Sequence, residues 1–155
     1  MKIFYRSLLL LLLFSNICFA ESKSDVYKFK KIDSFSGFIS SSKLGESATD
    51  NERLPISDSY VDVNVVLKEK PGAGTFSLVH FMMKGMGFTP IDISHSAFIA
   101  AGNGTVLNAY VTPDAAAVLS DVDVDTVINI KAIHLYNFSR GPRLIILAAA
   151  PVTES

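Results

Sequence analysis

The sequence predicts a mainly β fold: a small barrel of five or six strands with one short helix. Three observations favour it. The chain of 155 residues is 49% apolar and 19% charged, which suits one globular core. Residues 60–68 alternate between apolar and polar positions, and residues 97–151 contain a β-hairpin, a helical segment and two further strand-like runs. An open β-sandwich is the alternative architecture.

Residues 1–20 have the layout of a secretory signal peptide. Lys2 and Arg6 precede an apolar run, and Ala20 supplies the small residue of a cleavage site. The apolar run is too short for a good membrane span. We therefore expect export to the periplasm or the medium, with no transmembrane segment after cleavage. A retained anchor and lipidation of Cys18 are the alternatives.

Cleavage after residue 20 would remove the only cysteine, so the exported chain would depend on its hydrophobic core without a disulfide. The full chain has a formal net charge of −1. A dedicated nucleic-acid binder is usually strongly basic, so this balance disfavours nucleic acid as a partner.

Residues 21–59 are rich in serine and show no sustained period, which predicts a flexible N-terminal arm before a barrel domain at 60–155. Tyr27, Phe29 and Phe35 are aromatic, however, and a wholly disordered tail rarely contains so many aromatic residues. Either part of the arm adds a strand or packs on the barrel, or the arm is a partner-binding segment.

In the first half of the barrel domain, residues 60–68 predict a half-buried strand, with valines on one face and Asp62 and Asn64 on the other. Residues 70–74 contain Pro and two Gly and predict a turn. The next apolar run, residues 75–83, predicts a second strand.

The second half begins with a hairpin. Residues 98–101 and 105–111 are β-prone runs separated by Gly102-Asn103-Gly104, residue types that accept a positive φ at a tight reversal. Thr112 then fits as the N-cap of a short helix with Pro113 in its first position. We expect this helix to end near Leu119.

Two strands follow, at 126–138 and 143–150, joined by a turn at Ser139-Arg140-Gly141-Pro142. The stretch 98–150 resembles the oligonucleotide/oligosaccharide-binding (OB) fold, a Greek-key barrel with a helix between its third and fourth strands. The chain departs from it by one extra expected strand and by lacking the usual glycine before the fourth strand.

The resemblance implies a binding face on the second and third barrel strands, flanked by the first and last loops. The candidate residues on it are Asn108, Tyr110, Tyr136, Phe138, Arg140 and Arg143. Aromatic rings and guanidinium groups together suit stacking on sugars or bases and pairing with anionic groups. In the alternative interpretation, Tyr136 and Phe138 are ordinary core residues and the arginines belong to a solvated turn.

A second candidate site is His80, Met82 and Met86. Thioether and imidazole groups are ligands that suit copper as Cu(I), and on a strand His80 and Met82 would project to the same face. The alternative is that the methionines fill gaps in the core.

No nucleophile elbow, phosphate-binding loop or paired-carboxylate pattern stands out in the chain. We therefore expect a binding or adaptor module of a bacterial envelope that is not an enzyme. It would contact an envelope protein partner through the last hairpin and the N-terminal arm. A periplasmic copper carrier, a binder of anionic glycan or nucleic acid, and an unrecognised hydrolase are the alternatives.

Overall fold

The computed structural model describes residues 27–45, 47–49, 51–56, 59–89, 91–102 and 104–152. The expected signal peptide at residues 1–20 lies outside them, as does Asn103 of the expected hairpin turn. Among the described helices, none is both long and apolar enough to cross a lipid bilayer.

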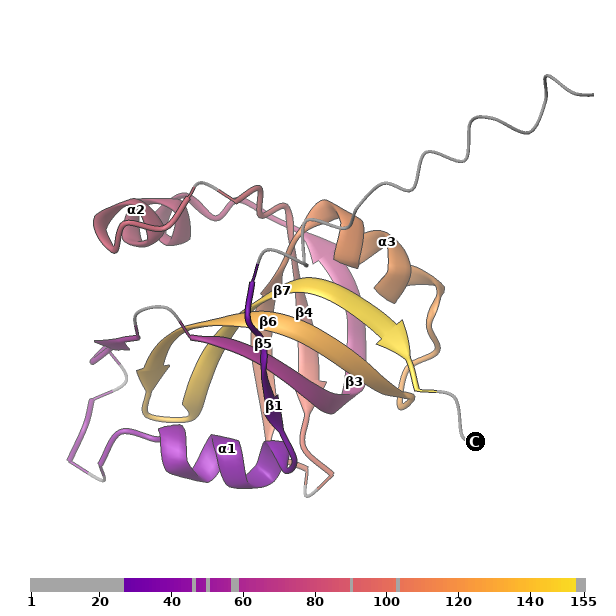
Figure 1. Cartoon of the computed structure of the whole chain (residues 1–155), viewed down its shortest axis with the longest axis horizontal. Helices are drawn as coiled ribbons and strands as arrows, with labels where there is room; N and C mark the ends of the chain where they lie inside the picture. Colours follow the sequence, from indigo (N-terminus) through magenta and orange to yellow (C-terminus); the bar gives the residue numbers. More distant parts are fainter. Residues whose placement is uncertain are drawn as a thin grey trace, which may run out of the picture.

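Five strands close into a barrel (Figure 1). Around the barrel they follow the order β3 (Tyr60–Ala73), β4 (His95–Ala100), β5 (Val106–Val111), β7 (Gly141–Pro151) and β6 (Val127–Phe138). Antiparallel pairing of β3 with β6 completes the circle, and among the pairings of these five strands only β5–β7 is parallel. Because the sheet closes on itself, the predicted OB-like barrel is confirmed and the open sandwich is not.

Alternation along the strands explains the barrel interior. Val61, Val63 and Val65 are buried in one core cluster, while the intervening Asn64 is exposed. The helix α3 (Pro113–Asp121) lies between the third and fourth barrel strands, as the OB resemblance implies. Its N-cap is Thr112, whose hydroxyl oxygen accepts a hydrogen bond from the Ala115 N–H at 3.5 Å.

The segment predicted to be a flexible arm carries three elements that pack on the barrel (Figure 1). The strand β1 (Lys30–Ile32) pairs in parallel with β3, and β2 (Leu54–Pro55) pairs with the end of β6. Between them, α1 (Phe35–Ser42) buries Phe35 and Ile39 in the main core. In these described parts the arm therefore adds strands to the sheet and packs on it, which was the first of the two alternatives.

The predicted strand at 75–83 is wrong, because this stretch forms the helix α2 (Ser77–Gly85). The predicted turn at 70–74 is also displaced, since β3 continues to Ala73. Val79 and Met83, four residues apart, are buried in a second cluster that contains Ile133 and Ile145. Residues four apart share one face of a helix, whereas a strand would bury Phe81 on the same face as Val79 and Met83, and Phe81 is exposed.

Candidate functional site

The barrel has an open seam between β5 and β7. The strand β5 pairs with β4 along its whole length, but it pairs with β7 only at Tyr110 and Val111. No described strand pairs with residues 106–108 on the side that faces β7. We call this gap the seam.

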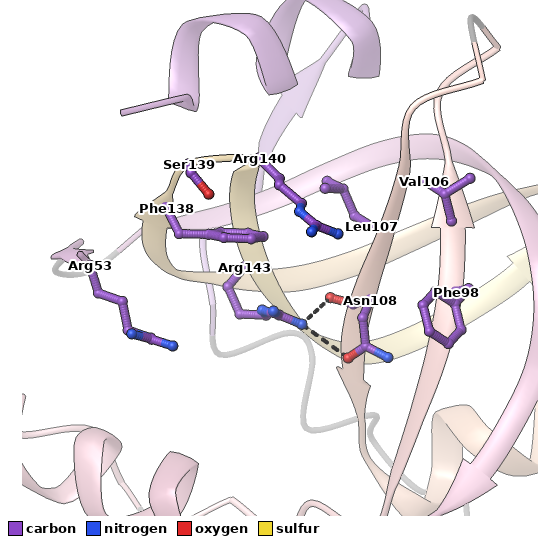
Figure 2. A pocket seen from close by; sticks show the side chains of 9 residues that line it. All are labelled: Arg53, Phe98, Val106, Leu107, Asn108, Phe138, Ser139, Arg140 and Arg143. Carbon is purple, nitrogen blue, oxygen red and sulfur yellow. Dashed lines mark hydrogen bonds between the residues drawn. The ribbon is translucent and has the colours of Figure 1, made fainter. Parts of the chain in front are cut away.

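A pocket of about 240 Å³ lies at the seam (Figure 2). Side chains from β4, β5, the β6–β7 hairpin and the segment before β2 line it: Phe98, Val106, Leu107, Asn108, Phe138, Ser139, Arg140, Arg143 and Arg53. Of the residues predicted for the binding face, the fold therefore brings Asn108, Phe138, Arg140 and Arg143 into one pocket.

Arg143 is the central side chain of this pocket. Its Nη1 donates hydrogen bonds to the Asn108 backbone carbonyl at 2.7 Å and to Asn108 Oδ1 at 3.0 Å. Its guanidinium carbon lies 4.9 Å from the Phe138 ring centroid and 5.4 Å from that of Tyr110. Figure 2 shows the side chain between Phe138 and Asn108. Two hydrogen bonds and two cation–π contacts hold the charge in a fixed position.

Tyr110 and Tyr136 are not among the lining residues of the pocket, but each contacts one of them: Tyr110 contacts Arg143 and Tyr136 contacts Phe138. Tyr136 is only 3% exposed, and its ring packs edge-on against Phe138 at 6.2 Å. Burial, followed by the neighbouring Tyr136, raises the pKa of Tyr110, so its hydroxyl stays protonated and hydrogen-bonds with Tyr136. Both tyrosines therefore support the aromatic wall and the position of Arg143.

The pocket is positively charged. Arg53, Arg140 and Arg143 line it, and none of its described lining residues is acidic. Across the part of the chain that the structure describes, the one ion pair is Lys68 with Asp125, so none of these arginines has a carboxylate partner there. The pocket is thus complementary to an anionic group that the described residues do not supply.

Arg53 was not among the predicted site residues. It belongs to a segment without periodicity, and pairing of Leu54 with Asn137 and of Pro55 with Tyr136 brings it to the pocket. Its guanidinium lies 5.6 Å from the centroid of the Tyr136 ring. Among the described residues, long-range contacts of this segment with β6 place it there, and a local pattern contains no such signal. The pairing between neighbouring β4 and β5, which sets Phe98 opposite Asn108, was the signal that could have identified Phe98.

The geometry expected for a copper site is not present at His80, Met82 and Met86. These residues lie on α2 and its C-cap, where positions two apart differ by about 200° around the helix axis, so His80 and Met82 do not share a face. His80 is exposed, whereas Met82 and Met86 pack against the second core cluster. The described residues also contain no group of three or more His, Cys, Asp or Glu side chains that could hold a metal ion.

No protein-family model and no curated protein matches this chain.

Proposed function

We propose that this protein is a binding module, not an enzyme, that holds an acidic segment of a protein partner in the seam pocket. The observation that carries the proposal is the set of three arginines, Arg53, Arg140 and Arg143, gathered at one pocket with no carboxylate partner among the described residues. An anionic group bound there would gain charge-assisted hydrogen bonds.

The apolar part of the site favours a protein as the partner. Phe98 is 37% exposed and Val106 is 45% exposed, and both line the same pocket as the arginines. Exposed aromatic and aliphatic side chains beside arginine are typical of protein interfaces. The cations come from both predicted contact regions, since Arg53 belongs to the N-terminal arm and Arg140 to the last hairpin.

The compartment of the proposed partner follows from the sequence pattern of residues 1–20, which favours export. The partner would then be a protein of the bacterial envelope. Its binding would weaken as salt increases, because part of the attraction is between exposed charges.

Affinity capture from the envelope of cells that produce the protein tests this proposal. Arg140→Glu reverses one exposed charge at the pocket, and Lys84→Glu makes the same charge change on α2, away from it. We expect wild type and Lys84→Glu to retain the same defined protein, with loss on Arg140→Glu and at high salt. Equal recovery by all three forms would show that the pocket is not the interface.

Direct titrations distinguish the other ligand classes. A sulfated oligosaccharide and a single-stranded oligonucleotide are tested with wild type and Arg140→Glu. Arginine-dependent binding of either polymer, without a captured protein, would replace the protein partner with that ligand.

A further inference from the structure

The direction of the backbone groups in β5 shows what faces the seam. The Val111 carbonyl accepts a hydrogen bond from the Ser94 N–H at 3.3 Å, on the β4 side. The Thr112 N–H donates to the Ile146 carbonyl at 3.1 Å, on the β7 side. Because backbone groups alternate sides along a strand, odd-numbered residues of β5 face β4 and even-numbered residues face β7.

Two residues of β5, Val106 and Asn108, therefore present backbone groups to the seam that no described strand pairs with. Tyr110 reaches a strand partner in β7, Ile145, but Val106 and Asn108 have no described strand partner on that side. At the Asn108 carbonyl the Arg143 side chain donates the hydrogen bond that a neighbouring strand would otherwise supply. This part of β5 is therefore a short exposed strand edge, at which the Arg143 side chain makes one of the hydrogen bonds that a neighbouring strand would make.

We propose that the partner segment binds in an extended conformation and pairs with β5 along Val106–Asn108, as an added strand in the seam. This inference rests on the proposed function and specifies how the acidic segment binds. Strand addition to an exposed sheet edge is a recurring mode of peptide recognition, in which backbone hydrogen bonds give affinity and alternate side chains give specificity.

The two sides of the seam indicate the side-chain pattern of the segment. Even-numbered residues of β5 project outward, whereas Leu107 projects into the barrel core and is 2% exposed, yet still lines the pocket. An added strand would alternate in the same way. Its outward side chains would meet Arg140 and Arg143, so we infer acidic residues there, alternating with apolar residues that point toward Leu107.

A proline at position 106 tests the backbone contact. The N–H of Val106 faces the seam and takes no part in pairing with β4, so Val106→Pro removes one seam donor and leaves the β4–β5 ladder intact. Val106→Ala is the matched control, since it shortens the same side chain and keeps the N–H. The probe is a synthetic peptide of alternating glutamate and valine, capped at both ends.

We expect the peptide to bind Val106→Pro about tenfold more weakly than Val106→Ala, because both variants lose the valine side chain but only the proline variant loses the N–H. Arg140→Glu should also weaken binding, whereas Lys84→Glu should not. Thermal unfolding of each variant checks that the fold is kept.

Amide hydrogen exchange on the wild-type protein gives a second measurement that needs no variant. Binding of the peptide should slow exchange at Val106 and Asn108 and leave Leu107 unchanged, because the Leu107 amide already faces β4.

The outcomes separate the two proposals. Arginine-dependent binding that tolerates Val106→Pro and leaves both amides unprotected would overturn strand addition and leave the proposed function standing. Binding that ignores Arg140→Glu, or binding of the sulfated oligosaccharide or oligonucleotide in place of the peptide, would overturn both.

Discussion

Position 141, next to the candidate site, strongly disfavours a side chain. Gly141 has a φ of +132°, and a Cβ added there would lie 3.1 Å from Ile39 Cγ2 of α1. We expect Gly141→Ala to lower the free energy of unfolding by about 1–3 kcal/mol, from backbone strain and from displacement of α1. Urea unfolding measures this loss.

Gly72→Ala is the control for that substitution, because its added Cβ has no heavy atom within 4 Å. Its free energy of unfolding should change by less than about 0.5 kcal/mol. Equal losses for the two alanine variants would contradict the close packing of α1 against the β6–β7 hairpin.

Among single residues, the sequence predicted the site where the contributing elements are local and regular. Asn108 and Arg143 were named because the OB resemblance implies a binding face there, and each lies on a strand whose limits follow from its apolar pattern and the adjoining turn. Arg53 was missed because a two-residue strand, β2, brings it there. Such a short pairing depends on the completed barrel and leaves no periodic signal in the sequence.

At the scale of elements, α2 shows how a short apolar run misleads. The segment SLVHFMMKG has too few polar residues to reveal either period clearly, so a strand and a helix fit it about equally well. The helical signal is the burial of Val79 and Met83 with Phe81 exposed between them, because a strand would place all three on one face. It becomes visible only when the outer surface of β6 and β7 is known.

The helical assignment of α2 predicts different losses of stability at positions 81 and 83, where a strand would predict similar ones. Met83 is 1% exposed and Phe81 is 75% exposed, although two residues that far apart on a strand would share a face. We expect Met83→Ala to lower the free energy of unfolding by about 2–4 kcal/mol and Phe81→Ala to change it by less than about 0.5 kcal/mol. Chemical denaturation of both variants makes the comparison, and similar losses would contradict the helix.

For the whole molecule, the barrel could be predicted because all five of its strands carry patterns that predict them, and four of them adjoin a short turn or the capped helix α3. Packing of the N-terminal segment on the barrel was one of two alternatives that its aromatic residues suggested, but the elements that do the packing could not be located from the sequence. The helix α1 contains three consecutive serines and a glycine, a composition typical of a loop, and it is held by burial of Phe35 and Ile39 in a core built from later residues.

This packing creates a pH-sensitive point between α1 and the barrel. His134 of β6 is 5% exposed, its ring meets the Phe38 ring of α1 edge-on at 5.0 Å, and its Nε2 lies 2.6 Å from Asn137 Oδ1. Burial lowers the pKa of His134 below its ordinary value of 6.5, and the hydrogen bond with Asn137 opposes that effect without cancelling it. The folded protein therefore favours the neutral imidazole.

The sign of the pH dependence follows from this shift. Below its ordinary pKa of 6.5, His134 takes up a proton more readily in the unfolded chain than in the folded one, so the stability contributed by neutral His134 is complete above that pH. It should be lost as the pH falls toward the lower pKa of the folded state. Urea unfolding at about pH 7.5 and about pH 5.5 measures the loss.

Comparison of variants isolates the contribution of His134 from that of the carboxylates, which also begin to titrate at the lower pH. We expect His134→Gln to reduce the difference in free energy of unfolding between the two pH values, whatever its effect on stability at either one. His80→Gln removes an exposed histidine and should keep the wild-type difference. If His134→Gln also kept the wild-type difference in free energy of unfolding between the two pH values, the buried imidazole would not couple protonation to folding. A reduced difference would place a proton-linked contact where α1 joins the barrel, because Phe38 and Asn137 enclose the ring from both elements.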